Sequence, residues 1–227
     1  MPATSFHAVL FDLDGTLLDT APDLAYALNV LLQEQDRAPL SFETIRPHVS
    51  HGATALVKLG FALDPSNPHF EPLRQRFLAL YKANLARETR LFEGMAAVLE
   101  DLESRGIAWG VVTNKPAWLT EPLLDALELR RRAACVISGD SLAVKKPHPE
   151  PLLVACKQIG ADPARSVYVG DAERDVAAAR AAGMRALVAH FGYLGTEDRP
   201  HEWGAHGHIT RPDELLSWMN SEGRDAS

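Results

Sequence analysis

The sequence lacks the features on which secreted and membrane proteins depend. It has 2 cysteines among 227 residues, whereas small secreted domains use several disulfides to stabilise their folds. No segment approaches the run of about 18 apolar residues that a transmembrane helix needs. Asp12 and Asp14 occur before an apolar stretch like that of a signal peptide can develop. We therefore expect a soluble cytoplasmic protein with no membrane partner.

Positive charge is also scarce. The chain has 23 Lys and Arg against 30 Asp and Glu, which gives a formal net charge of −7. Because proteins that bind nucleic acid non-specifically carry a basic surface, we expect no nucleic-acid partner. With 46% hydrophobic and 23% charged residues, the composition is that of an ordinary globular protein. The length allows one or two domains.

Short apolar runs alternate with amphipathic segments along most of the chain. The runs are apolar on both faces, as parallel strands covered by helices must be, and they lie at 7–11, 108–112, 135–137, 166–169 and 185–188. Helical periodicity follows most of them, at 95–105, 119–127, 149–159 and 175–182. This order predicts an α/β fold with a doubly wound parallel sheet.

The segment after the first predicted strand breaks the alternation. From about Pro22 to Ala86 only helical periodicity is evident, at 24–32, 42–49, 53–61 and 72–85. We therefore expect residues 21–87 to form a small helical domain. It would be inserted into an α/β core domain made of residues 1–20 and 88–227.

Two aspartates follow the first predicted strand directly. Asp12 and Asp14 would lie at the carboxyl end of a parallel strand, where such sheets bind ligands. Carboxylates this close repel each other unless a cation compensates their charge. An EF-hand calcium loop needs Gly at its sixth position, but Gly15 is the fourth residue of this run and a strand precedes it. The remaining alternative is a pair of loop carboxylates that only cap a helix.

Polar side chains follow three more of the predicted strands. Each group alone is common in ordinary turns and helix caps. Together they would place hydroxyl, ammonium and carboxyl groups at the same edge of the sheet as the first two aspartates, which favours a ligand-binding site over a purely structural role. The residues are Thr113 and Asn114, Lys145 and Lys146, and Asp171 and Asp175.

These segments resemble, in order and context, the four motifs of the phosphatase-type members of the haloacid dehalogenase superfamily. The motifs read Asp-x-Asp-Gly-Thr-Leu-x-Asp-Thr, Val-Thr-Asn-Lys-Pro, Lys-Pro-His-Pro-Glu-Pro and Gly-Asp-x-x-x-Asp, and the resemblance covers essentially the whole chain. The helical insertion resembles the type-1 cap of that family. The resemblance implies a phosphomonoester hydrolase whose partner is a small phosphorylated substrate, with the chain a monomer or a homodimer.

The resemblance also implies a role for each motif residue. Asp12 would be the nucleophile and would form an aspartyl-phosphate. Asp14 would act first as general acid and then as general base. Thr113, Asn114 and Lys146, the lysine that directly precedes proline, would bind the phosphoryl oxygens.

A divalent cation completes the implied site, because a carboxylate cannot approach a phosphate dianion unaided. The resemblance implies Mg²⁺ as the cofactor. Asp12, the backbone carbonyl of Asp14 and Asp171 would be its ligands. Asp175 would support these ligands without binding the ion directly.

The segments around the motifs point to two groups of phosphatases within this superfamily. His51 and Gly52 are candidate substrate contacts of the cap, in a loop where phosphoglycolate phosphatases usually carry Asn between two glycines, whereas this chain has Ser50-His51-Gly52. Other segments are more similar to the N-acetylmuramic acid 6-phosphate phosphatases of cell-wall recycling; these are residues 91–95, 112–116, 121–123 and 202–205. We favour the muramic acid substrate, with 2-phosphoglycolate as the alternative and a sugar phosphomutase as a third hypothesis.

Other chemistry has little support in the sequence. It contains no G-x-x-x-x-G-K-[ST], G-x-G-x-x-G or G-x-S-x-G motif. His201-Glu202 does not begin a zinc-protease motif, because Ala205 stands where the second histidine belongs. His206 and His208 would share a strand face, but with no third ligand evident we expect no metal site there.

Overall fold

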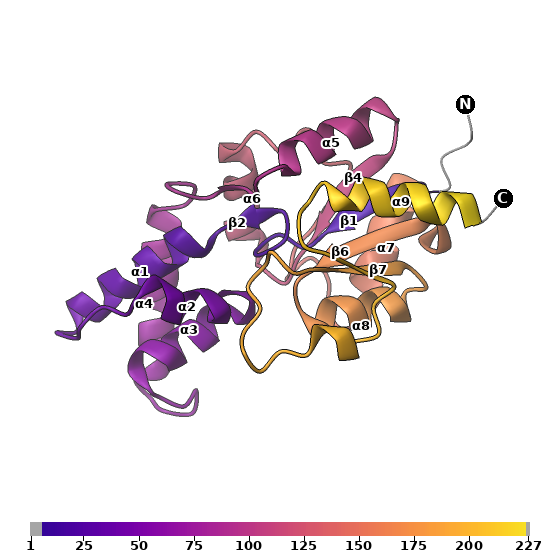
Figure 1. The fold of residues 1–227 in the computed structure, drawn as a ribbon. Helices are drawn as coiled ribbons and strands as arrows, with labels where there is room; N and C mark the ends of the chain where they lie inside the picture. Colours follow the sequence, from indigo (N-terminus) through magenta and orange to yellow (C-terminus); the bar gives the residue numbers. More distant parts are fainter. Residues whose placement is uncertain (1–5, 226–227) are drawn as a thin grey trace.

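The computed structural model describes residues 6–225, with side chains described up to residue 222, as a sheet covered by helices and a group of helices beside it (Figure 1). The sheet has 6 strands in the order β5-β4-β1-β6-β7-β8, and every pairing is parallel. The doubly wound parallel sheet expected from the sequence is confirmed. Its strands are β1 (Ala8–Phe11), β4 (Ala108–Val112), β5 (Val136–Ile137), β6 (Ser166–Gly170), β7 (Arg185–Ala189) and β8 (Gly207–Ile209).

The last helix was not among the predicted elements. A strand was expected only locally, at His206 and His208, whereas the edge strand β8 includes His208 but not His206. Strand β8 has 3 residues, with the exposed His208 in the middle, so it has no apolar run to reveal it. Strand β8 forms because it pairs with β7, and His208 lies opposite Val188 in this pairing. The last helix, α9 (Glu214–Asp225), packs Leu215 into the core beside the sheet.

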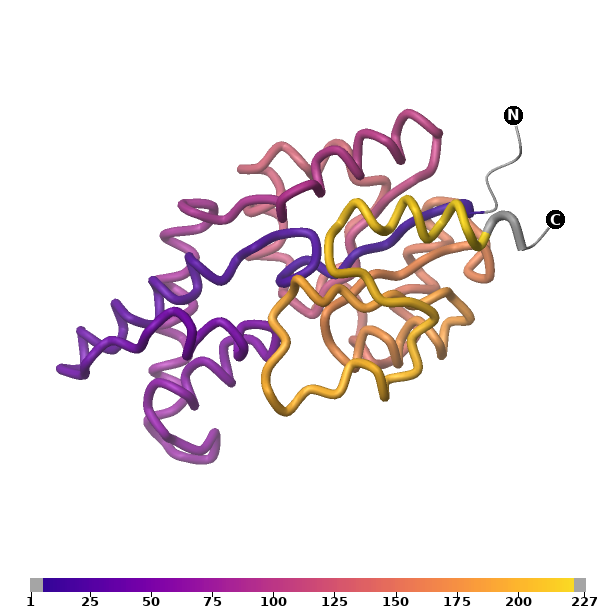
Figure 2. The backbone as a smooth tube through the Cα atoms, viewed as in Figure 1, coloured from indigo at the N-terminus to yellow at the C-terminus, as the bar shows by residue number. Residues whose placement is uncertain are grey.

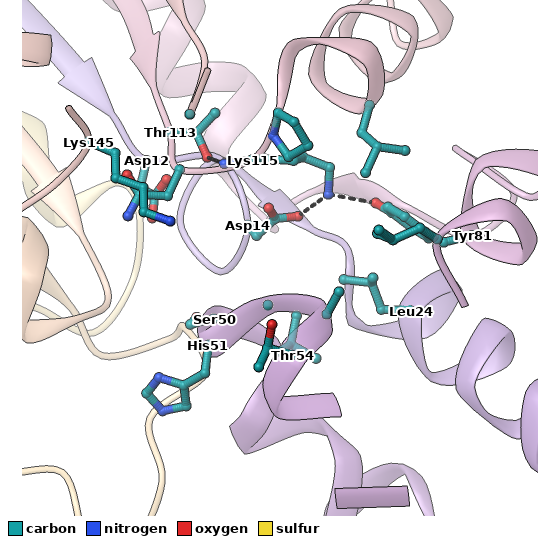
Figure 3. Close-up of a pocket in the computed structure, with 18 of the residues that line it drawn as sticks. Asp12, Asp14, Leu24, Ser50, His51, Thr54, Tyr81, Thr113, Lys115 and Lys145 are labelled. Carbon is teal, nitrogen blue, oxygen red and sulfur yellow. Dashed lines mark hydrogen bonds and ion pairs between the residues drawn. The ribbon is translucent and has the colours of Figure 1, made fainter. Parts of the chain in front are cut away.

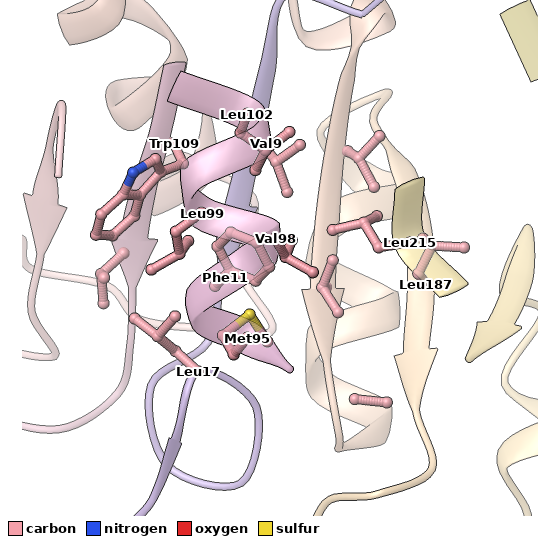
Figure 4. Close-up of a cluster of buried hydrophobic side chains, with 14 of the residues drawn as sticks. Val9, Phe11, Leu17, Met95, Val98, Leu99, Leu102, Trp109, Leu187 and Leu215 are labelled. Atoms are coloured by element: carbon pink, nitrogen blue, oxygen red, sulfur yellow. The ribbon is translucent and has the colours of Figure 1, made fainter. Parts of the chain in front are cut away.

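Helices cover both faces of the sheet. The helices are α5 (Met95–Ser104), α6 (Ala117–Ala126), α7 (Glu150–Ile159) and α8 (Glu173–Ala181), each within two residues of its predicted bounds. Val9 and Phe11 point to the face covered by α5, α6 and α9, and Figure 4 shows Leu99 of α5 against them. Leu10 points to the opposite face, which α7 and α8 cover. Because strand side chains alternate, a strand buried on both faces reads as a continuous apolar run.

The helices beside the sheet have a hydrophobic core of their own. They are α1 (Ala21–Glu34), α2 (Phe42–Ile45), the 3₁₀ helix η1 (Arg46–His51), α3 (Gly52–Phe61) and α4 (Phe70–Ala83). Leu28, Leu31, Leu56 and Phe77 are fully buried within it. The predicted helix at 42–49 divides into α2 and η1 at Pro47, because proline has no N–H to continue an α-helical ladder.

The chain passes between the helical group and the sheet twice, as Figure 2 shows. A two-stranded antiparallel sheet, which the sequence did not predict, lies at these passages: β2 (Leu18–Asp19) pairs with β3 (Arg90–Leu91). The buried Asp23 carboxylate accepts hydrogen bonds from the Glu88 N–H at 2.9 Å and from the Thr89 N–H at 3.0 Å. The outgoing and returning segments are therefore held together. Among the residues that the structure describes, no helix has the length and apolar character to cross a membrane.

Candidate active site

Sheet topology places a crevice at the end of β1. After β1 the chain adds β4 and β5 on one side, and it then returns to add β6, β7 and β8 on the other. Connections that diverge in this way leave a ligand-binding crevice at the carboxyl ends of the strands. Asp12, Thr113, Lys146 and Asp171 follow β1, β4, β5 and β6 and come together there, as predicted from their positions.

Lys146 lies at the centre of the charged groups and is 2% exposed. Its Nζ is 3.0 Å from Asp12 Oδ1 and 2.8 Å from Asp175 Oδ1, and it donates to the Tyr168 hydroxyl at 2.6 Å. Removing one partner of a buried ion pair typically costs about 3–5 kcal/mol. Lys146 therefore stabilises this part of the fold as well as supplying positive charge beside Asp12. Lys145 is exposed and lines the cavity, where Figure 3 shows it near Asp12.

Asp12 is held as a carboxylate. Burial alone would raise its pKa, but Lys146 and Arg174, together with the hydrogen bonds from Lys146 and the Leu13 N–H, keep the pKa below its usual value. The Leu13 N–H donates to Oδ1 at 2.7 Å, and Lys146 approaches the same oxygen. Among the described residues no hydrogen bond is made to Oδ2, so this oxygen is available to a ligand.

Three buried carboxylates gather beside Lys146. Oxygens of Asp12, Asp171 and Asp175 all lie within 4.8 Å of one another. Burial, with added repulsion from Asp12 and Asp175, raises the pKa of Asp171 to about 7. The Asp175 Oδ2 accepts the Ala172 N–H at 3.0 Å, which orients that carboxylate at the start of α8.

This arrangement fits a small divalent cation. Carboxylate oxygens are the ligands that Mg²⁺ prefers, and a double positive charge would relieve the repulsion that raises the pKa of Asp171. Gly15 keeps the space beside the cluster open, because a Cβ at this position would collide with the Asp171 carboxylate. Its φ of 81° also lies in the region that glycine adopts most readily.

Asp14 has partners that the sequence did not reveal. Its Oδ1 accepts from Lys115 Nζ at 2.9 Å and from the Thr20 hydroxyl at 2.6 Å. The same ammonium lies 2.9 Å from the Tyr81 hydroxyl of α4, and Figure 3 shows Lys115 between Asp14 and Tyr81. Lys115 belongs to the Val-Thr-Asn-Lys-Pro segment, but a lysine in a turn is usually solvated, so nothing local distinguished it.

Thr113 and Asn114 contribute in different ways. Both line the cavity, and the Thr113 hydroxyl accepts from the Lys115 N–H at 3.2 Å. The Asn114 amide instead holds the backbone of Lys146, donating to its carbonyl at 2.9 Å and accepting from its N–H at 3.1 Å. The Asn114 side chain therefore positions Lys146, and the backbone N–H of Asn114 is left to bind an anion.

The loop that carries His51 and Gly52 reaches the carboxylate cluster through Ser50, a contact that the sequence did not predict. The Ser50 hydroxyl donates to Asp171 Oδ2 at 2.6 Å, and Arg174 donates to the Ser50 carbonyl at 2.8 Å. His51 and Gly52 line the cavity beside Ser50, and Figure 3 shows Ser50 and His51 across from Asp14. Partial burial, with Arg174 nearby, lowers the pKa of His51.

The cavity between the two groups of elements has a volume of about 550 Å³, within the range of pockets for drug-sized ligands. One wall carries Asp12, Asp14, Lys115 and other charged groups at the sheet edge. The helical group lines the other side with a cluster of apolar side chains, Leu24, Val49, Phe77, Leu78 and Tyr81, and with the polar Ser50, His51, Thr54 and Arg74, while Leu119 of α6 adds a further apolar side chain. The site can therefore hold a phosphate at one end and an organic group with apolar parts at the other.

Comparison with known proteins agrees with this fold and site. Residues 9–189 match the model of the haloacid dehalogenase-like hydrolase family, and the chain belongs to that family. An N-acetylmuramic acid 6-phosphate phosphatase of Pseudomonas putida is 44% identical over 215 residues, which are 95% of this chain and 96% of that protein. A phosphoglycolate phosphatase of Xanthomonas campestris is 45% identical over 210 residues, 92% of this chain and 94% of that protein.

Solved structures show the same architecture. The crystal structure of a predicted phosphoglycolate phosphatase from Haemophilus somnus matches with a TM-score of 0.83 and 27% identity, covering 95% of this chain and 98% of that one. With its relatives and this structural neighbour taken together, the chain is a phosphatase of the haloacid dehalogenase-like family. The family, fold and enzyme class expected from the sequence are thereby confirmed.

Proposed function

We propose that this phosphatase hydrolyses N-acetylmuramic acid 6-phosphate, with Mg²⁺ as cofactor and an aspartyl-phosphate intermediate. The observation that favours this substrate is the cluster of apolar side chains that the helical group contributes to the 550 Å³ cavity. The substrate's N-acetyl and lactyl groups each carry a methyl that these side chains accommodate. The similarity to the Pseudomonas putida relative, whose name specifies this substrate, supports the same reading.

The proposed chemistry begins at Asp12. Its Oδ1 is held by Lys146 and the Leu13 N–H, which orients the carboxylate for attack on phosphorus by a free oxygen. Thr113, Lys146 and the Asn114 N–H would bind the phosphoryl oxygens as charge shifts during transfer.

Asp14 is the proposed proton donor to the leaving alkoxide, and it later takes a proton from the water that hydrolyses the intermediate. The Lys115 ammonium and the Thr20 hydroxyl both contact its Oδ1. These contacts fix the carboxyl group at the entrance to the organic end of the cavity, where a leaving oxygen would lie. Lys115 and Tyr81 are therefore positioning residues, since they act on the substrate through Asp14.

The proposed Mg²⁺ site comprises Asp12, Asp171 and the backbone carbonyl of Asp14, with Asp175 in support. When bound, the cation neutralises charge between the nucleophile and the phosphate. Ser50 and the Tyr193 N–H hold Asp171 Oδ2 at 2.6 and 2.9 Å, so the ligand is oriented from both the helical group and the sheet.

We further propose that residues 21–87 act as a cap domain on the core formed by residues 1–20 and 88–227. The β2–β3 pair and the Asp23 hydrogen bonds lie where the two parts join. We also propose a cytoplasmic location, which is supported by Cys135 and Cys156 both being free thiols in the structure. The state of association, monomer or homodimer, stays a prediction.

The alternative substrate is 2-phosphoglycolate, which is favoured by the position of Arg174 in the cavity. Arg174 lines the cavity next to Ser50 and His51, and a guanidinium there could pair with the carboxylate of a two-carbon acid. Such a small substrate would leave the apolar side chains of the helical group uncovered, which is why we rank 2-phosphoglycolate second.

The test is phosphate release from a panel of phosphomonoesters, with and without Mg²⁺. We expect the highest kcat/KM on N-acetylmuramic acid 6-phosphate and no appreciable release without the cation. A clear preference for 2-phosphoglycolate would reverse the order of the two substrates. Conversion of a sugar monophosphate to its isomer in the presence of a bisphosphate, with no phosphate released, would indicate a mutase.

A further inference from the structure

Three histidines meet at the far edge of the sheet, outside the cavity described above. His190 directly follows β7, His201 lies in the 3₁₀ helix η3 (Pro200–Glu202), and His208 is in β8. One ring nitrogen of each lies within 4.8 Å of the others. His190 Nε2 and His208 Nδ1 are 2.9 Å apart, and the ring centroids are separated by 4.6 to 5.3 Å. From the sequence, no third ligand was evident for the pair His206 and His208; the structure places His190 and His201 beside His208.

The pair considered from the sequence is divided by the fold. His206 turns to the backbone, where its Nδ1 accepts from the Ala186 N–H at 3.0 Å. His208 instead joins His190, because β8 pairs with β7 and sets His208 opposite Val188. The third member, His201, comes from the loop between the two strands.

Three imidazoles in this arrangement are the ligand set of a transition metal. Imidazole nitrogens suit Zn²⁺, Ni²⁺ and Cu²⁺ rather than Mg²⁺ or Ca²⁺. Two nitrogens bound to a tetrahedral ion at about 2.0 Å lie about 3.3 Å apart, which the present separations reach with shifts of about 1 Å. His201 and His208 are exposed, so an ion and a water ligand have access from solvent.

The segment that begins and ends at this cluster carries contacts to the active site. Its Tyr193 hydroxyl donates to Asp19 at 2.7 Å and accepts from the Thr20 N–H at 2.6 Å, and its N–H donates to Asp171 at 2.9 Å. The Phe191 carbonyl accepts from Arg46 of η1 at 2.9 Å. Figure 2 shows this segment, in golden orange, running from β7 toward the helical group and back.

We propose that His190, His201 and His208 bind one divalent transition metal ion, of which Zn²⁺ is the representative, and that the ion closes the base of the 190–201 segment. Closing both ends of a loop reduces the conformations it can adopt. The bound ion would thus stabilise the loop that orients Asp171 and contacts the passage into the helical group. This site is separate from the carboxylate cluster and has a different ligand preference.

The experiment titrates Zn²⁺, and Co²⁺ as a spectroscopic probe, into chelator-treated protein held in millimolar Mg²⁺ so that the carboxylate cluster is occupied. We expect one equivalent of Zn²⁺ to bind with a Kd at or below about 10 µM, and the Co²⁺ form to show the visible absorption of a nitrogen-ligated site. At a hundredfold excess over Kd, the melting temperature should rise by about 5 °C or more.

The variants are His201→Ala and His208→Gln, with His206→Ala as the matched control that removes a neighbouring histidine outside the cluster. Each cluster variant should weaken Zn²⁺ binding at least tenfold and abolish the thermal shift, while the control keeps both. Circular dichroism checks that each variant is folded. Equal binding by the unchanged protein and both cluster variants, or no binding at micromolar Zn²⁺, would overturn the proposal. So would binding that is lost only in Asp171→Asn, because the ion would then lie in the carboxylate cluster.

Discussion

The two walls of the cavity are built on different principles. On the sheet side, Asp12 lines the cavity and Lys146 and Asp171 lie beside it; all three are at most 3% exposed and each has two or more polar partners. On the helical side, His51 is exposed and Gly52 places no side chain in the cavity. Buried ionic groups must be fully partnered, whereas a half-exposed loop residue is free to vary. From this difference we propose that the sheet edge sets the chemistry and the helical side sets the selectivity for substrate.

The largest expected loss of activity follows from a substitution on the sheet side of the cavity. Asp12→Asn keeps the size of the side chain but removes the attacking charge, so turnover should fall at least about a thousandfold on every substrate. The measurement is steady-state phosphate release, with thermal unfolding as the control for folding. Substantial activity in this variant would exclude the aspartyl-phosphate mechanism and the division between the two walls.

Metal dependence tests the same wall without mutation. Removing divalent cations with EDTA should lower turnover by at least about a hundredfold, and Mg²⁺ should restore it. Excess Ca²⁺ should inhibit, because its larger and less rigid shell tends to take both oxygens of a carboxylate and so occupies the attacking oxygen of Asp12. Equal rates with the two ions would count against this site, and the assay is initial rate at varied ratios of Mg²⁺ to Ca²⁺.

An intermediate effect is expected where the walls meet. Lys115→Met removes the ammonium that joins Asp14 to Tyr81, so Asp14 loses a fixed orientation and kcat should fall about 10- to 100-fold, with a smaller change in KM. Tyr81→Phe keeps Lys115 and should lower kcat only a few-fold.

Lys157→Met, an exposed change on α7, is the matched control and should leave kcat unaltered. The pH profile of kcat should shift in Lys115→Met and not in the control. An unchanged profile and kcat in Lys115→Met would show that the ion pair contributes only to structure.

The smallest expected effect is a change in substrate preference, caused by a substitution on the helical side of the cavity. His51→Ala should narrow the ratio of kcat/KM between N-acetylmuramic acid 6-phosphate and 2-phosphoglycolate by a few-fold, because remote contacts raise catalysis by fixing the phosphoryl group. Activity on p-nitrophenyl phosphate, which makes no such contacts, should change little. The direct measurement is competition between the two substrates at equal concentration. A similar loss on all three substrates would place His51 with the catalytic wall instead.

The position of many residues of the candidate site could be predicted, because each has a local signal in the sequence. Asp12, Thr113, Lys146 and Asp171 each follow a strand that reads as an apolar run, and parallel strands bring their carboxyl ends to one edge. Strands β2 and β3 and the place of β8 in the sheet could not be predicted, because with 2 or 3 residues each these strands have no apolar pattern of their own and form through pairing.

By itself, the sequence determined the α/β sheet, the helical insertion and the order of the motif residues, since periodicity and strand-end chemistry are properties of neighbouring residues. Tertiary structure alone decided which side chains became partners across long separations. It set Lys115 between Asp14 and Tyr81, joined Ser50 to Asp171, which is 121 residues away, and brought His190, His201 and His208 together. Such contacts depend on the packing of whole elements against one another, and no local pattern encodes which polar side chain of one element will face another.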